Sequence, residues 1–281
     1  MTRSEKVGDT YDSKLIKLAD CLDSLRFDNN CYGKISRENH GSFEWIWWHS
    51  EYRNWSTRDT SQLLYIQGKP GSGKSTLARY FHDNLQQREP AAASAIIAKF
   101  LYSHREGQLQ TSHSNMLQSI LFDIRAQDEF FFYHQFQTNY RQYKALAARN
   151  GGVHMHWPYE LLKDTLAFLQ TYAHSSGYYL IIDAIDESDE DDRCDVFNFL
   201  FDICANTKQC TVKAVVASRP VGQLEIRRSQ FHGFIRLQDE TQNDILNFAR
   251  SFLWGLNLTV FLDKAVIYII DNAHGVFIWC S

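Results

Sequence analysis

Short apolar runs alternate with longer stretches of helical periodicity along most of the chain. The apolar runs have the length and residue types of buried strands, and they lie at 63–67, 93–103, 178–183, 210–218 and 233–237. Apolar residues at helical spacing predict helices from Lys74, over 112–146, 158–174 and 194–205, and at the end over 241–255 and 258–273. This alternation predicts an α/β fold with a parallel sheet covered by helices on both faces.

The first 60 residues follow a different pattern. Residues 12–25 carry apolar positions at helical spacing and predict a short amphipathic helix. An irregular stretch follows, and its segment FEWIWWHSEYRNW (43–55) holds four of the seven tryptophans. We expect these rings to pack in the core or between domains, with a docking surface as the alternative. The segment could also wrap the base of a nucleotide.

Composition excludes several classes of protein. The net charge is −4 and the pI is about 6.2, without the basic excess expected of a nucleic-acid binder. The N-terminus has no apolar leader, and no run is long enough to span a bilayer. The six cysteines lack CxxC pairing and metal-site spacing, so we expect reduced, mostly buried thiols and a cytoplasmic protein.

A glycine-rich loop between the first strand and the first core helix matches the pattern GxxxxGK[ST]. The nucleotide-binding residues predicted from it are Gly68, Lys69, Pro70, Gly71, Ser72, Gly73, Lys74, Ser75 and Thr76. Glycines let backbone N–H groups turn toward an anion, and the following helix directs its positive dipole end to the same place. Lys74 would reach the β- and γ-phosphates, and the Ser75 hydroxyl would bind Mg²⁺.

Acidic residues follow the third strand. Asp183 ends that strand and is predicted to hold Mg²⁺. Asp186 and Glu187 come next, where a carboxylate could orient or deprotonate an attacking water; the alternative is that they belong to a charged first turn of the next helix. We assign residues 189–192 to that turn. Arg219, at the end of the fourth strand, would sense a γ-phosphate or form an ion pair with a loop carboxylate.

Two other features favour ordinary structural roles. The HMH segment (154–156) lacks a third ligand and is more typical of a surface loop than of a metal site. The aromatic run FFFYHQF (130–136) is expected to pack in a helix pair, and its exposure would instead indicate a partner surface.

These motifs together resemble a known family. LLYIQGKPGSGKSTLARYF (63–81), LIIDAIDE (180–187) and VVASRP (215–220) look like the Walker A, Walker B and sensor 1 motifs of NACHT NTPases. The closest resemblance is to the fungal group labelled nephrocystin-3-like N-terminal domains. Supporting stretches lie at 21–27, 43–55, 100–107, 115–124, 244–253 and 274–280. Ala184 departs from the family, which often has glycine there.

The resemblance implies a P-loop NTPase with a five-stranded parallel sheet in the order 5-1-4-3-2. It divides the chain into an N-terminal helix and Trp-rich linker (1–60), the NTPase core (61–239) and a partial helical subdomain (240–281). By carry-over, Asp183 is the magnesium ligand, Glu187 or Asp186 the hydrolytic carboxylate and Arg219 the sensor 1 arginine. The family usually adds an effector, a winged-helix lid and repeats, so we expect a truncated gene product or a standalone switch.

The expected function is therefore an ATP-binding signalling switch with slow Mg²⁺-dependent hydrolysis. GTP is the alternative nucleotide, because nothing in the sequence fixes base preference. The partners expected are the nucleotide, further copies of the chain or longer NACHT relatives, with no nucleic acid. An alternative is a non-enzymatic decoy or scaffold that joins the oligomers of such relatives. A kinase or GTPase is less favoured, because the chain shows no Arg-rich lid and no NKxD motif; NTKQC (206–210) lacks the aspartate.

Overall fold

A computed structural model describes residues 20–26, 31–131, 136–149, 157–173, 177–207, 209–255 and 262–277. Its centre is a sheet of five strands, all paired in parallel: β1 (Gln62–Gln67), β2 (Ile96–Leu101), β3 (Tyr178–Asp183), β4 (Val212–Ser218) and β5 (Gly233–Arg236). The strand order is β2-β3-β4-β1-β5, which confirms the predicted order. All five predicted strands are present, with ends that differ by a few residues from the apolar runs.

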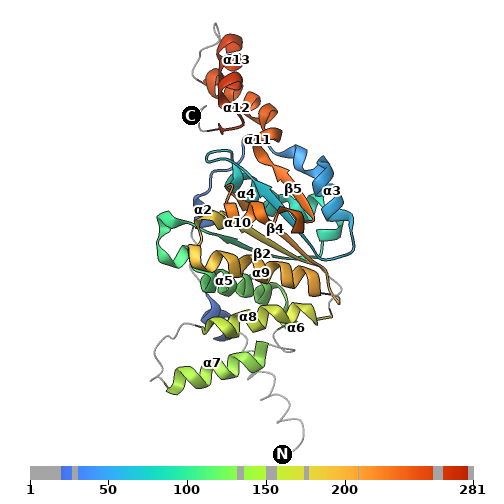
Figure 1. Cartoon of the computed structure of the whole chain (residues 1–281), viewed down its shortest axis with the longest axis vertical. Coiled ribbons are helices and arrows are strands. Elements are labelled where there is room, and N and C mark those ends of the chain that lie inside the picture. Colours follow the sequence, from blue (N-terminus) through green and yellow to red (C-terminus); the bar gives the residue numbers. More distant parts are fainter. Residues whose placement is uncertain are drawn as a thin grey trace, which may run out of the picture.

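Helices and short 3-10 turns join the strands (Figure 1). Up to the third strand they are α2 (Cys31–Lys34), η1 (Glu44–Trp48), α3 (Ser50–Thr57), α4 (Lys74–Arg88), η2 (Pro90–Ala92), η3 (His104–Glu106), η4 (Gln108–Gln110), α5 (His113–Gln127), α6 (Glu129–Phe131), α7 (Gln137–Arg149), α8 (Tyr159–Ala167) and η6 (Phe168–Gln170). After it come η7 (Ile185–Glu187), α9 (Glu190–Asn206), α10 (Gly222–Ile226), η8 (Arg228–Gln230), α11 (Leu237–Glu240), α12 (Gln242–Gly255) and α13 (Leu262–Ala273).

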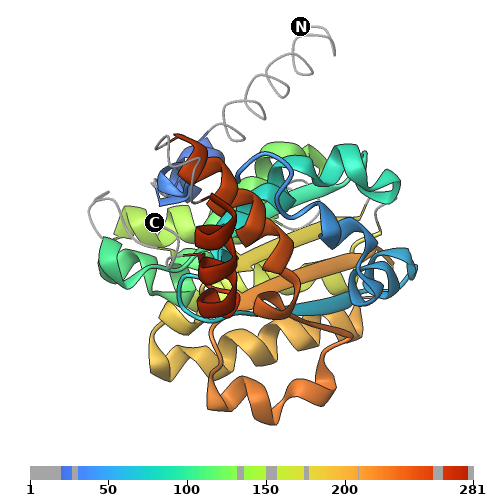
Figure 2. The ribbon, with the colours of Figure 1, turned by 90° about the horizontal axis from the view of Figure 1, so that it is seen from above.

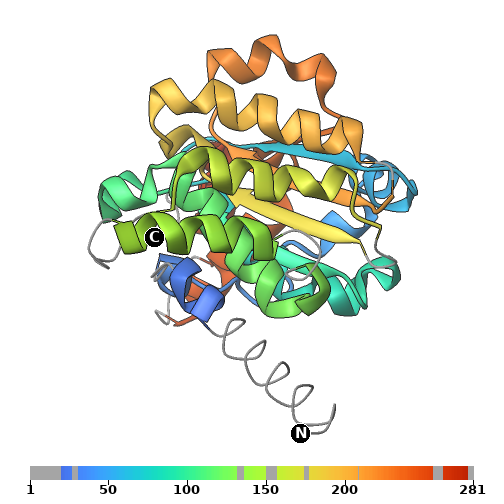
Figure 3. The ribbon, with the colours of Figure 1, turned by 90° about the horizontal axis from the view of Figure 1, so that it is seen from below.

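The sheet is buried on both faces, as the apolar runs predicted. Successive residues of a strand point to opposite faces. In β1, Leu63 and Tyr65 join a core formed with α5, α8 and α9, whereas Leu64 and Ile66 join a second core formed with α3 and α4. α7 lies at the end of the molecule away from α12 and α13 (Figures 1 and 3).

One continuous helix over 112–146 was predicted, and this prediction was wrong. The chain leaves the helical conformation at Asp128, between α5 and α6. The Asp128 carboxylate accepts hydrogen bonds from the backbone N–H groups of Phe130 (2.9 Å) and Phe131 (3.2 Å). It also accepts one from the Tyr178 hydroxyl (2.8 Å). A buried cap with a tertiary partner therefore outweighs the apolar periodicity that suggested one helix.

The two closing helices were predicted correctly in kind. α12 and α13 pack against each other above the carboxyl ends of the strands (Figures 1 and 2). The helix predicted over 158–174 is shorter, because α8 gives way to the η6 turn and the chain leaves helix at Thr171. Of the helix predicted at 12–25, only residues 20–25 are described, and they are helical.

The Trp-rich segment forms η1 and α3 and packs mainly inward. Trp47 and Trp55 are buried, which confirms the packing interpretation for these two rings, whereas Trp48 is 76% exposed. In the run 130–136, Phe131 and Phe136 are buried as expected, whereas Phe130 is 69% exposed; residues 132–135 lie outside the described part. The HMH segment (154–156) also lies outside it.

The remaining expectations concern cysteines and membranes. Five cysteines fall within the described residues; all are free thiols and four are buried. Among the helices that the structure describes, none has the length and apolar character needed to cross a bilayer.

Candidate functional site

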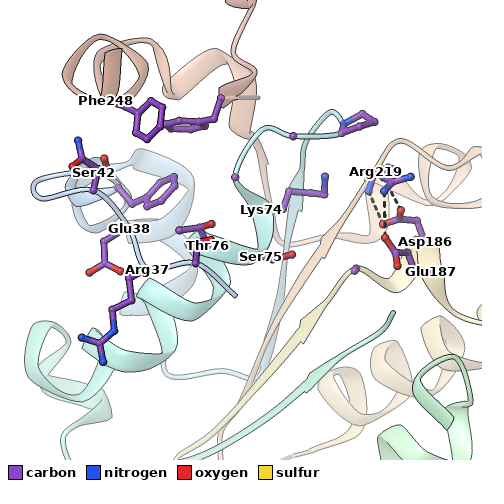
Figure 4. Close-up of a pocket in the computed structure, with 18 residues that line it drawn as sticks. Arg37, Glu38, Ser42, Lys74, Ser75, Thr76, Asp186, Glu187, Arg219 and Phe248 are labelled. Carbon is purple, nitrogen blue, oxygen red and sulfur yellow. Dashed lines mark hydrogen bonds and ion pairs between the residues drawn. The ribbon is translucent and has the colours of Figure 1, made fainter. Parts of the chain in front are cut away.

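A cavity of about 450 Å³ opens at the carboxyl edge of the sheet, beyond the ends of β1, β3 and β4 (Figure 4). This edge is where ligands bind in open parallel sheets. The cavity walls come from four places in the sequence: the segment 36–43, the loop and helix start at 70–76, the loop 184–187 with Arg219, and the rings of Phe248 and Phe277.

The glycine-rich loop leaves β1 and turns back to begin α4. The Gly68 N–H donates to the Ser218 carbonyl (3.0 Å), which ties the loop to the end of β4. A Cβ on Gly68 would lie 2.4 Å from Ser72 Oγ, so no larger residue fits there without movement. Gly71 and Gly73 have φ angles of 72° and 88°, in the left-handed region that glycine adopts readily. The motif residues are thus required by the backbone path.

Lys74 begins α4 and its ammonium group reaches back across the loop. Its Nζ donates to the carbonyls of Gly68 (2.9 Å) and Lys69 (3.0 Å). Burial lowers the pKa of Lys74, while the nearby carboxylates of Asp186 and Asp183 raise it. Within the described residues its hydrogen bonds go to neutral carbonyl oxygens, so an anion in the cavity would give the ammonium a hydrogen-bonded partner of opposite charge.

Asp183 is fully buried at the end of β3. Its Oδ1 accepts the Ala184 N–H (2.8 Å), whereas its buried Oδ2 accepts no hydrogen bond within the described residues. Burial raises the pKa of the Asp183 carboxyl to about 6, and the Ser75 hydroxyl and the Lys74 ammonium oppose this rise. Ala184 follows with φ at 54°, a left-handed conformation that favours the glycine often found there in the resembling family.

These groups could hold a magnesium-bound phosphate chain. The donor set fits, because Mg²⁺ prefers oxygen ligands and Asp183 Oδ2 is a buried carboxylate oxygen in need of a cation. Ser72 Oγ is also buried and, among the described residues, has no hydrogen-bond partner. Lys74, Ser75, Thr76 and Pro70 line the cavity itself. Asp183 and Ser72 lie behind its wall.

Arg219 contacts both loop carboxylates, those of Asp186 and Glu187 (Figure 4). Its Nε is 3.3 Å from Asp186 Oδ2, and its Nη2 donates to Glu187 Oε1 at 3.2 Å. Its backbone N–H also donates to Asp186 Oδ1 (2.9 Å). The ion pair that sequence reasoning left open is therefore present, in the same cavity as Lys74.

A buried arginine fixes the loop that carries these carboxylates. Arg193, on α9, donates to the backbone carbonyls of Asp186 (2.9 Å) and Ser188 (2.8 Å). α9 begins at Glu190, so the acidic residues 190–192 form its first turn after Asp189, as predicted. The sequence did not single out Arg193, because an arginine in an acidic run looks like a surface residue.

Several cavity residues were also missed by sequence reasoning. Phe43 and Phe277 both lie beside Gly73, since a Cβ there would be 3.2 Å from each ring, and the two ring centroids are 6.0 Å apart. The Phe277 N–H donates to the Gly71 carbonyl (2.9 Å), so residues 276–277 rest on the glycine-rich loop. Ser42 is buried, lines the cavity and has an unpartnered hydroxyl within the described residues. Only the suggestion that 43–55 wraps a base pointed toward this end.

Asp244 joins the N-terminal segment to the closing helices. On α12, its Oδ2 accepts the Phe43 N–H (3.2 Å) and the Trp45 indole N–H (2.9 Å). Asp244 is 4% exposed, and burial raises its pKa. One buried carboxylate therefore holds together two walls of the cavity that lie about 200 residues apart in the chain.

The family described as Nephrocystin 3, N-terminal matches residues 41–219, which is more than half of the chain and spans the glycine-rich loop through Arg219. No curated protein matches the chain.

Proposed function

The chain belongs to the nephrocystin 3 N-terminal family, and on that premise we propose that it is a P-loop NTPase module of the NACHT type. In this proposal it binds ATP with Mg²⁺ as the ligand that sets its conformational state, and hydrolyses ATP slowly. The proposal rests on two groups beside one glycine-rich loop: the buried Lys74 ammonium, which is hydrogen-bonded to two carbonyls, and the buried Asp183 Oδ2, which has no hydrogen-bond partner within the described residues. In such an arrangement the ammonium would contact phosphate oxygens and the carboxylate would contact the magnesium ion.

Each residue has a role that follows from its position. Lys74 would exchange the carbonyls of Gly68 and Lys69 for phosphate oxygens. Backbone N–H groups of the loop and of the start of α4 would donate to the same phosphates, helped by the helix dipole. Ser75 and Asp183 would hold Mg²⁺, which supplies neutralising charge for the departing phosphate.

The aromatic wall of the cavity would contact the base. Phe43 and Phe277 present aromatic rings beside Gly73, and Ser42 offers a free hydroxyl. Stacking on such rings accepts any purine, so the rings themselves do not choose between ATP and GTP. ATP is the nucleotide proposed here, by resemblance to the NACHT ATPases, and GTP stays the alternative.

A second candidate function is nucleotide binding without turnover, as in a decoy or scaffold. The contacts of Glu187 favour binding without turnover. Its Oε1 accepts a hydrogen bond from Arg219 (3.2 Å), and its Oε2 accepts one from the His104 N–H (3.1 Å). With one hydrogen bond on each oxygen, Glu187 has fewer lone pairs free to orient a water. We expect hydrolysis to be faster once Glu187 leaves this arrangement after the nucleotide binds.

The test is calorimetric titration of the purified chain with ATP and Mg²⁺. Wild type should bind, and Lys74→Ala should lose about 100-fold in affinity, because charged hydrogen bonds to two phosphates are removed. Lys144→Ala is the matched control, since it deletes the same charge on α7, at the far end of the molecule (Figure 1). If wild type binds no nucleotide, or if Lys74→Ala binds as well as wild type, the proposed function is wrong.

A further inference from the structure

The two carboxylates that contact Arg219 are held in different ways. Asp186 Oδ1 accepts the Ser218 hydroxyl (3.2 Å) and the Arg219 backbone N–H (2.9 Å), so the end of β4 fixes it whatever the Arg219 side chain does. Its side chain is 8% exposed. Glu187 is 23% exposed and is held only by the Arg219 side chain and the His104 N–H within the described residues. Glu187 is therefore the carboxylate that can change partners.

The Arg219 side chain is equally able to move. It is 46% exposed and lines the cavity that also contains Lys74 and Ser75. Its guanidinium has several N–H donors, of which Nε and Nη2 contact carboxylates of the described residues. A rotation about the last side-chain bonds can break the contact with Glu187 while Asp186 still holds the backbone and the near end of the side chain.

We propose that Arg219 is exchanged between Glu187 and the terminal phosphate of a bound nucleoside triphosphate. This exchange rests on the proposed function. A terminal phosphate carries more negative charge than one carboxylate and accepts a bidentate guanidinium, so it outcompetes Glu187. A diphosphate lacks that group, and Arg219 then stays on Glu187. Asp186 is the pivot that positions Arg219 in both arrangements.

The exchange gives Glu187 its catalytic role only when a triphosphate is bound. Once Arg219 has left, Oε1 can accept a hydrogen bond from a water that attacks the terminal phosphorus. The new O–P bond forms as the bond from phosphorus to the bridging oxygen breaks and the diphosphate leaves. The water proton passes to Glu187 and then to the phosphate product. Loss of that phosphate returns Arg219 to Glu187, which ends the cycle in the arrangement of this structure.

A double-mutant cycle on the ratio of two affinities tests the exchange. We would measure binding of ADP and of the β,γ-imido analogue of ATP, both with Mg²⁺, to wild type, Glu187→Gln, Arg219→Gln and the double variant. Removing the competing carboxylate should raise the preference for the triphosphate analogue about 2- to 5-fold, the size of a partly exposed ion pair. In the Arg219→Gln background the same change should raise the preference less, because only direct repulsion between Glu187 and the phosphates is then removed.

The cycle separates the exchange from simple charge removal. Any direct repulsion between Glu187 and the phosphates acts in both backgrounds and cancels. Glu190→Gln removes the same charge from the first turn of α9 and should leave the preference unchanged, since Glu190 makes no described contact with Arg219. Equal effects of Glu187→Gln in both backgrounds would overturn the exchange and leave the proposed function standing. Absence of nucleotide binding by wild type would overturn both.

Discussion

Replacing Asp183 with asparagine should stabilise the nucleotide-free protein and abolish its magnesium-dependent binding. Burial raises the pKa of the Asp183 carboxyl from 3.8 to about 6, so the folded protein holds that proton more tightly than the unfolded chain does. The cost of ionising Asp183 therefore grows as the pH rises from about 4 to about 6, and stays constant above that range. A rise of about two pKa units corresponds to about 3 kcal/mol.

Asparagine removes this cost but introduces another. Its amide oxygen can still accept the Ala184 N–H, whereas its NH₂ group replaces the unpartnered Oδ2 and becomes a buried donor. An unsatisfied buried donor costs about 1–2 kcal/mol, so the expected net gain at neutral pH is about 1–2 kcal/mol. For a chain of this length, this is a rise of a few degrees in melting temperature.

The assay is thermal unfolding of both proteins with a chelator and without nucleotide, at pH 7.5 and at pH 5. At pH 5 about half of the ionisation cost remains, so the advantage of Asp183→Asn should shrink or reverse sign. Asp191→Asn, an exposed acid of α9, controls for general charge effects. An advantage that is equal at the two pH values, or a variant less stable than wild type at pH 7.5, would refute the reasoning.

Two further changes test the walls of the cavity by chemical denaturation. Gly73→Ala places a side chain at φ 88°, 3.2 Å from two aromatic rings, and should cost about 2 kcal/mol. Gly41→Ala, at φ 80° with nothing within 4 Å of its Cβ, should lower the free energy of unfolding by less. Equal losses of stability in the two variants would show that the two rings do not restrict the residue at position 73. Asp244→Ala removes the acceptor of two buried N–H groups and should cost about 2–4 kcal/mol with a change in tryptophan fluorescence. An unchanged fluorescence and stability, like that expected of the exposed Asp239→Ala, would contradict the role given to Asp244.

The fold was predictable because its signals are local. Each strand is a short apolar run, and both faces of the sheet are buried, so the run needs no alternation. The prediction failed at Asp128, where the reason is not local. Its carboxylate caps the next turn and accepts a hydrogen bond from Tyr178, 50 residues further on. Neither contact changes the apolar periodicity of 112–146, so the sequence pattern does not reveal the break.

The site was predictable at its glycine-rich loop and much less so at its aromatic wall. Gly71 and Gly73 adopt left-handed φ angles that favour glycine, so the glycines of the motif predict the backbone path of the loop. Phe277, Phe43 and Ser42 have no such requirement, and an aromatic or a serine occurs anywhere in a chain. Their place in the cavity appears only when distant segments are brought together.

The sequence by itself determined the order of strands and helices, the path of the glycine-rich loop and the position of Asp183 at a strand end. Periodicity, φ preferences and residue spacing depend on residues close together in the chain, so they can be recognised from the sequence alone. Tertiary structure decided which groups meet. Arg219 contacts both Asp186 and Glu187, and Asp244 contacts Phe43, 201 residues away. Such pairings depend on how the sheet edge and the closing helices pack, which no local pattern encodes.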